Sequence, residues 1–153
     1  MSQISPISTS GEAAAEVVTT RLLAYPREAV FAAFSDPAKL AGWWGPEGFT
    51  NTFELFDFQP GGEWTFVMHG PDGRNYPNHS RFAEIVAPEK VVFDHLDQGF
   101  EFRMVMTFED LGGSTRLTWR MSLSPRMREM RDFIVQANEQ NFDRLEGCLK
   151  GGA

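Results

Sequence analysis

Cysteine is almost absent from this chain of 153 residues, in which Cys148 is the only one. A single cysteine excludes an intrachain disulfide, and nothing else points to an oxidising compartment. The first sixteen residues lack the basic segment and the apolar stretch of a signal peptide, and they do not form a membrane anchor. We therefore expect a cytoplasmic protein in which residues 1–15 form a flexible tail.

Basic charge is also scarce. Fourteen Lys and Arg residues stand against 21 Asp and Glu residues, which gives a net charge of -7. This balance argues against a nucleic-acid partner unless basic residues cluster. One cluster exists, at Arg126, Arg128 and Arg131, but Glu129 and Asp132 interrupt it. We expect no nucleic acid among the partners.

Histidine is the third scarce residue, with His69, His79 and His95 as the three present. None has the HExxH, HxH or cysteine-paired spacing of a metal site, so we predict no metal and no cofactor. Cys148 has no histidine near it in the sequence, which argues against a nucleophilic thiol. We assign no catalytic residue, and this composition favours a binding protein over an enzyme.

Aromatic side chains are abundant by contrast, with 14 Phe and 4 Trp. The segment 37–49 carries Trp43 and Trp44 side by side between glycines. Neighbouring residues on a regular element face different directions, so at most one of the two rings is expected to point straight into the core. We predict that one closes an end of the interior as a plug, while the other anchors a short helix or forms a rim.

The pattern along the chain predicts an α+β domain over residues 16–150. A β-branched strand at 16–25 precedes two short helices, one from Pro26 and one from Pro37. Turn signals about every ten residues then separate six further strands. These strands are expected at 49–58, 63–69, 76–86, 91–96, 100–108 and 115–123.

The last part of the chain changes period. Residues 126–150 contain no Pro, and no Gly before Gly147, and their apolar side chains recur every three or four positions. This predicts one long helix of about 35 Å. A seven-stranded antiparallel sheet, curved by its glycine-rich turns and packed on this helix, would enclose a volume between the two.

Strand alternation places a stripe of aromatic and methionine side chains on the inner face of the sheet. The stripe comprises Trp64, Phe66, Met68, Phe100, Phe102, Met104, Met106, Phe108, Trp119 and Met121. Methionine adapts to varied apolar shapes, so the stripe is either core beneath the helix or the lining of a ligand cavity. It can also be core at one end and lining at the other.

Several polar residues lie among these apolar ones. They could orient the polar end of a ligand, or they could satisfy one another. The candidate ligand-binding residues are Trp43, Trp44, Phe49, Trp64, Phe66, Met68, Tyr76, Asn78, Phe93, His95, Phe102, Met104, Met106, Trp119, Met121, Phe133, Ala137, Asn138 and Asn141.

Residues 17–149 resemble the homologues of the heat-shock-protein-90 ATPase activator, within the START-like (SRPBCC) superfamily. The motifs that carry the resemblance are Pro26 with Val30 and Phe31, Asp36-Pro37, Trp43-Trp44-Gly45-Pro46, Pro60-Gly61-Gly62, Gly70-Pro71-Asp72-Gly73, Glu84 and Pro88-Glu89. The resemblance implies the helix-grip fold of START domains and birch-pollen allergens, with a hydrophobic cavity between sheet and helix.

The superfamily has several functions, so the fold leaves three open. The first is binding of a small hydrophobic or lipid-like molecule. The second is a polyketide-cyclase-like enzyme, for which His95, Tyr76 and Glu84 are the acid-base candidates. The third is a module that modulates a chaperone ATPase, and here the chaperone partner, like a stress-related role, rests on the resemblance alone. START-like domains also pair as homodimers.

The chain departs from the family at one place. Similar sequences commonly carry a Gly-Trp pair in the last helix, where this chain has Ala137 and Asn138. Replacing a tryptophan by asparagine removes a large ring and adds a hydrogen-bonding group. If position 138 faces the cavity, the pocket is expected to be larger or more polar than in relatives.

Overall fold

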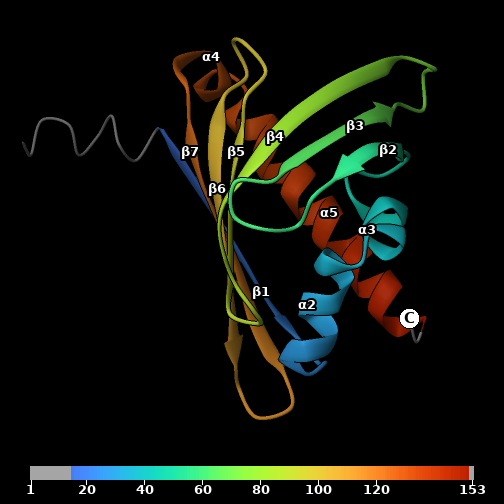
Figure 1. Cartoon of the computed structure of the whole chain (residues 1–153), viewed down its shortest axis with the longest axis vertical. Coiled ribbons are helices and arrows are strands. Elements are labelled where there is room, and N and C mark those ends of the chain that lie inside the picture. Colours follow the sequence, from blue (N-terminus) through green and yellow to red (C-terminus); the bar gives the residue numbers. More distant parts are fainter. Residues whose placement is uncertain (1–14, 152–153) are drawn as a thin grey trace, which may run out of the picture.

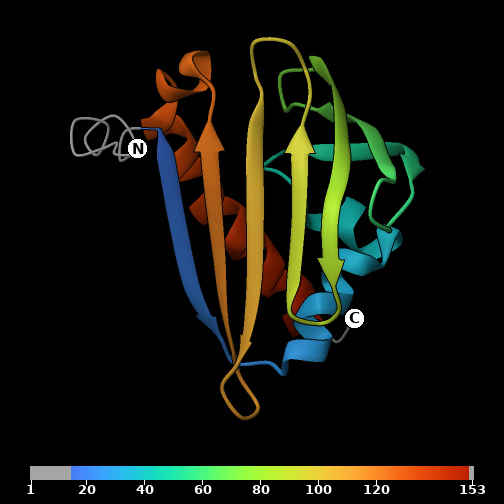
Figure 2. The same cartoon turned by 60° about the vertical axis from the view of Figure 1, so that its left-hand side comes forward.

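The computed structural model describes residues 15–151 and shows a curved antiparallel sheet packed on a long helix (Figure 1, Figure 2). Its strands are β1 (Glu16–Leu23), β2 (Thr50–Phe56), β3 (Glu63–His69), β4 (Asn75–Val86), β5 (Lys90–His95), β6 (Phe102–Asp110) and β7 (Thr115–Leu123). The strand order is β1-β7-β6-β5-β4-β3-β2, so β1 and β2 are the edges. The predicted seven-stranded sheet is confirmed.

The helices lie on one side of the sheet. They are α2 (Arg27–Ser35), α3 (Pro37–Trp43), α4 (Pro125–Arg128) and α5 (Arg131–Lys150). The long helix α5 lies across the concave face, and α2 and α3 pack beside its C-terminal half (Figure 1). The two short helices predicted after the first strand are thus confirmed.

Ala15 pairs with the end of β7, because its carbonyl oxygen accepts a hydrogen bond of 2.7 Å from the backbone nitrogen of Leu123. Except for Ala15, the tail expected at residues 1–15 lies outside the described residues. Within residues 15–151, no helix combines the length and apolar character needed to cross a membrane.

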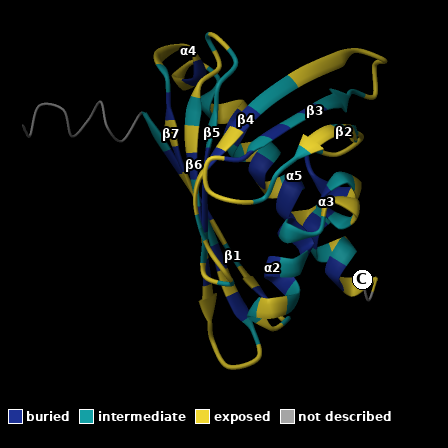
Figure 3. Cartoon of the chain, in the orientation of Figure 1, coloured by how far each residue is buried: buried dark blue, intermediate teal, exposed yellow. Residues whose placement is uncertain are grey.

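Alternation along the strands separates a buried face from an exposed one, as predicted (Figure 3). β7 shows it most clearly, because Leu117, Trp119 and Met121 are buried while Arg116 and Arg120 are exposed. The inner face packs against α2, α3 and α5 to form one core. Burial of this apolar surface is the main stabilising contribution to such a fold.

The Pro-Gly-Gly turn between β2 and β3 requires its glycines. A Cβ atom at Gly62 would lie 2.0 Å from the carbonyl oxygen of Asp57, a distance that no side chain tolerates. Gly61, at a φ of 84°, takes a backbone conformation that other residues rarely adopt. The tight turn follows from these two residues.

The long helix predicted at 126–150 is wrong in one respect, because it is interrupted before α5 begins. The backbone nitrogens of Glu129 and Met130 donate to the carbonyls three residues earlier, Arg126 and Met127. Such bonds belong to a tighter helix and end α4. Neither proline nor glycine marks this break, so the residue pattern does not predict it.

Phe133 does not lie on the buried face of the last helix, which corrects its predicted position. Its side chain is 60% exposed, whereas Ile134, Phe142 and Leu145 are buried. Helix α5 is a separate helix that begins at Arg131, and the first residue of its buried face is Ile134. Phe133 comes one position earlier in the helix, so its side chain points in a different direction.

Arg21 of β1 connects the sheet to the outward side of α5. Its guanidinium lies 2.7 to 2.8 Å from carboxylate oxygens of Glu139, Asp143 and Glu146. Partial burial acts to lower the pKa of Arg21, but the hydrogen bonds that it donates to these carboxylates outweigh this effect and raise that pKa. The pairs are largely exposed and fix the position of α5 more than they stabilise it.

The two phenylalanines of α5 provide a matched test of this orientation. Phe142→Ala should lower the free energy of unfolding by about 3–5 kcal/mol, because it empties a fully buried site. Phe133→Ala should change it by less than about 0.5 kcal/mol. Urea denaturation followed by circular dichroism measures both, and equal losses would contradict the assigned face of α5.

Candidate ligand-binding site

The two adjacent tryptophans are both buried, which corrects the expectation that only one ring would enter the core. Trp43 is the last residue of α3, and Trp44 follows it with extended backbone angles, φ -65° and ψ 135°. The helix therefore ends between them, and the change in backbone direction turns both rings inward. Trp43 is 2% exposed and Trp44 is 8% exposed.

Trp43 anchors the short helix. Its indole nitrogen donates a hydrogen bond of 3.0 Å to the carbonyl oxygen of Ala33 in α2. Its ring packs edge-on against Phe34, with a centroid distance of 4.8 Å. These contacts hold α3 to α2.

Trp44 fills the space between the sheet and α5. Its ring centroid lies 5.2 Å from Trp64, 5.4 Å from Trp119 and 6.2 Å from Phe93. The three partners come from β3, β7 and β5, so one ring contacts side chains from across the inner face. The prediction that one tryptophan closes an end of the interior is therefore wrong, because Trp44 lies in the centre of the core.

Arg144 of α5 holds the segment that carries Trp44. Its guanidinium donates hydrogen bonds to carbonyl oxygens of that segment, at 2.8 Å for Pro46 and Phe49 and 2.9 Å for Gly45. Burial lowers the pKa of Arg144 from its ordinary value. Further bonds, of 3.3 Å each, reach the carbonyl oxygens of Gly42 and Trp44.

Two asparagines complete this attachment. The Asn141 side-chain oxygen accepts a hydrogen bond of 3.1 Å from the backbone nitrogen of Gly45. The Asn51 amide donates to the carbonyl oxygens of Ala41 and Trp44, at 3.1 and 2.8 Å. Asn141 therefore holds backbone, and no ligand is needed to satisfy it.

Two tryptophans beside Trp44 carry unpartnered donors. The indole nitrogens of Trp64 and Trp119 are buried and have no hydrogen-bond acceptor among the described residues. A buried donor without an acceptor costs about 1–3 kcal/mol. The aromatic packing around Trp44 must offset this cost.

The predicted ligand-binding residues fall into two groups in the structure. The first group forms closed core and comprises residues of the central strands together with the two adjacent tryptophans: Trp43, Trp44, Trp64, Phe66, Phe93, Met104, Met106, Trp119 and Met121. The others lie towards the rim or on α5: Phe49, Met68, Tyr76, Asn78, His95, Phe102, Phe133, Ala137, Asn138 and Asn141.

His95 is engaged at both ring nitrogens. Nδ1 donates to the carbonyl oxygen of Phe100 at 2.9 Å, and Nε2 lies 2.8 Å from Asn78 Oδ1 and 2.9 Å from Asp97 Oδ2. The ring stacks on Phe102 at a centroid distance of 4.9 Å. His95 therefore holds the loop between β5 and β6 and is not a free base.

The three acid-base candidates do not converge. Tyr76 and Glu84 lie eight positions apart on β4, which corresponds to roughly 26 Å along the strand. Glu84 pairs with Lys90 at 3.2 Å, and both side chains are well exposed. No group of His, Cys, Asp and Glu side chains in the described part of the chain could hold a metal ion.

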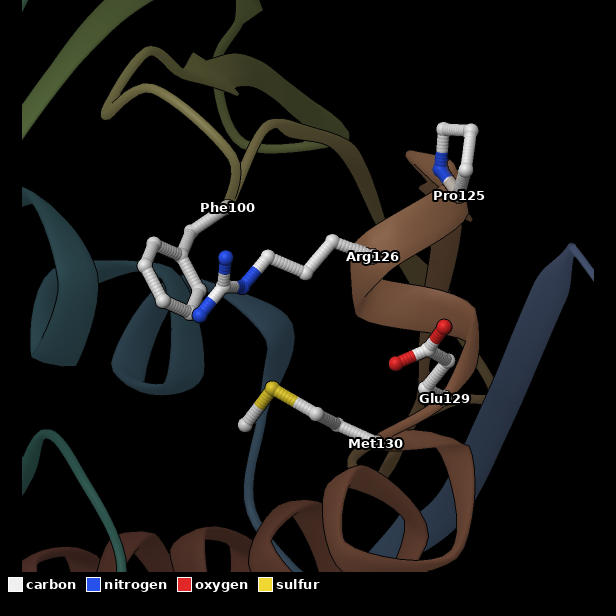
Figure 4. Close-up of a pocket in the computed structure, with 5 residues that line it drawn as sticks. All are labelled: Phe100, Pro125, Arg126, Glu129 and Met130. Atoms are coloured by element: carbon white, nitrogen blue, oxygen red, sulfur yellow. The ribbon is translucent and has the colours of Figure 1, made fainter.

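A pocket of about 750 Å³, open to solvent, lies beside α4. Figure 4 shows the side chains that line it. It is bounded by the loop between β5 and β6, by α4 and by the start of α5. The residues that line it are Phe100, Pro125, Arg126, Glu129 and Met130.

Sequence reasoning missed this pocket. It placed Phe100 on the inner stripe, yet β6 starts only at Phe102, and Phe100 lies in the preceding loop with 37% exposure. Arg126 and Glu129 were considered only as surface charge. The pocket depends on the break between α4 and α5, and no sequence signal marks that break.

The sequence pattern described as "Activator of Hsp90 ATPase homolog 1-like protein" matches residues 24–150. The chain belongs to this family. No curated protein matches it. The family assignment confirms the predicted resemblance and agrees with the fold.

Several solved structures share the fold of this family member. A protein from Arthrobacter aurescens superposes with a TM-score of 0.83 at 24% identity, over 91% of this chain and 88% of its own. A protein from Nitrosomonas europaea gives 0.83 at 21%, over 92% and 97%. The AHSA1 protein from Silicibacter pomeroyi gives 0.78 at 27%, over 91% and 100%.

Position 138, where we expected a departure from similar sequences, lies away from the pocket. Asn138 is buried between α5 and the sheet, where its amide donates to Thr19 Oγ1 at 3.1 Å and lies 3.5 Å from Met121 Sδ. It is not among the residues that line the pocket. The asparagine makes the interface of α5 with β1 and β7 more polar.

Replacing Arg144 tests the attachment of Trp44. Arg144→Lys should lower the free energy of unfolding by about 1–3 kcal/mol, because an ammonium group cannot reach carbonyls spread around a planar guanidinium. Arg103→Lys, which alters a surface pair with Asp94, should cost less than about 1 kcal/mol. Urea denaturation followed by tryptophan fluorescence gives both values, and equal losses would contradict the role of Arg144.

Proposed function

We propose that this protein binds a small hydrophobic molecule in the pocket beside α4. The observation that carries the proposal is the pocket itself, with its volume of about 750 Å³ and the apolar side chains of Phe100 and Met130 in its wall. The pocket is open to solvent, and it combines these apolar side chains with the charged side chains of Arg126 and Glu129. Ligand sites likewise pair apolar walls with a few polar groups.

The pocket adjoins the core. Met130 lines it and also packs against the buried cluster between the sheet and α5. An apolar ligand seated there would extend the hydrophobic interior outward. This supports binding at the rim of the interior, with the central-strand stripe as the underlying core.

The closed packing around Trp44 supports this placement over one in the centre of the fold. Trp44, Trp64 and Trp119 occupy the middle of the space between sheet and helix. A ligand there would have to displace Trp44, whose segment is held by Arg144 and Asn141. The pocket beside α4 needs no such rearrangement.

Binding is also better supported than catalysis. An acid-base enzyme needs two titratable groups within reach of the same substrate atom. His95 is occupied by its loop contacts, and Glu84 lies with Lys90. For a chaperone-modulating role, the support is the family assignment alone.

Titration with Nile red, a neutral apolar dye, tests the proposal. We expect saturable binding at one dye per chain with blue-shifted emission. Met130→Asp should weaken binding about tenfold or more, because it places a charge in the apolar wall. The variant is expected to fold, since Met130 is the N-cap residue of α5 and aspartate is favoured there.

Gln136→Asp is the matched control, because it adds the same charge to an exposed position of α5. It should leave dye binding unchanged, and both variants should keep the parental melting temperature within a few degrees. No saturable binding to the parent protein, or equal weakening by both variants, would overturn the proposal.

A further inference from the structure

The pocket contains a cation that the protein itself does not neutralise. Arg126 forms no side-chain hydrogen bond or ion pair within the described residues, whereas Arg21, Arg103, Arg116 and Arg120 each pair with carboxylates. The guanidinium carbon of Arg126 lies 4.7 Å from the ring centroid of Phe100. An aromatic face orients a guanidinium but leaves its in-plane donors available.

The side chain of Arg126 lies along the wall of the pocket and is exposed to solvent. Its side chain extends from α4 across the ring of Phe100 and above Met130 (Figure 4). Its Cδ atom lies within contact distance of Gly99, where an added Cβ would come to 3.4 Å. The charged end is therefore held beside apolar surface.

Glu129 also lines the pocket, but it does not neutralise Arg126. The carboxylate lies on the other side of the pocket from the guanidinium, close to the ribbon of α4 (Figure 4). A ligand that reaches Arg126 can therefore occupy the apolar part of the pocket and keep away from the carboxylate. Arg126 favours a negatively charged end group on the ligand, whereas Glu129 favours a positively charged one.

We infer that the ligand is an apolar molecule with a carboxylate at one end. This inference rests on the proposed function and specifies its ligand class. The carboxylate would accept two parallel hydrogen bonds from the guanidinium of Arg126. The apolar part would lie between Phe100 and Met130, where Met130 continues into the core.

Decanoate, decanol and decylamine, which share a chain length but differ in end group, test this class by displacement of Nile red. Decanoate should bind at least tenfold more tightly than decanol, because a charge-assisted hydrogen bond distinguishes them. Arg126→Gln should remove that preference, because it weakens decanoate binding about tenfold or more and decanol binding far less. The decanoate affinity should also fall as the salt concentration rises.

Two further variants serve as controls. Arg128→Gln removes the same charge from an exposed position of α4 that does not line the pocket, so the preference should persist. Glu129→Gln removes a repulsive charge and should tighten decanoate binding about two- to fivefold.

The outcomes separate the inference from the function on which it depends. If decanol and decanoate bind equally and Arg126→Gln changes neither, the ligand class is wrong while the pocket stands. Tightest binding by decylamine would likewise overturn the class. If none of the three displaces the dye, or the dye itself does not bind, the proposed function fails as well.

Discussion

The structure depends on one contact above the others, the attachment of Trp44 to the middle of the core. The backbone around this residue contains carbonyl groups that are not paired within a helix or strand. The single guanidinium of Arg144 donates hydrogen bonds to them. A planar group with five donors can serve several carbonyls at once, which an ammonium cannot. Sheet, short helices and long helix thus meet at one ring and one side chain.

The position of Trp44 also determines where the structure has a pocket. Because Trp44 fills the space between the sheet and α5, the described pocket lies at the other end of the long helix, beside α4. The break between α4 and α5 creates it by turning the chain before Met130. The fold is shared with relatives, and in this chain the chemistry of the pocket comes from Phe100, Arg126 and Glu129.

Much of the fold could be predicted because it rests on local periodicity. The alternation of apolar and polar residues in β7 and the turn residues of the hairpins are local patterns. They predict where the strands lie and which face of each strand is buried. The apolar residues that recur every three or four positions predict the last helix, but they place Phe133 wrongly on its buried face. A start shifted by one residue rotates a helix by about 100°, and hydrogen bonding at Glu129 and Met130 decided that start.

The sequence by itself determined the family, the order of strands and helices, and the apolar character of the inner face, because each follows from patterns within a few consecutive residues. The tertiary structure alone decided that both tryptophans are buried, that His95 is occupied by its loop, and that Arg126 lies over Phe100 without a carboxylate partner. These features depend on how side chains from different elements and loops come together, and the positions of those side chains follow only once the sheet has curved around α5.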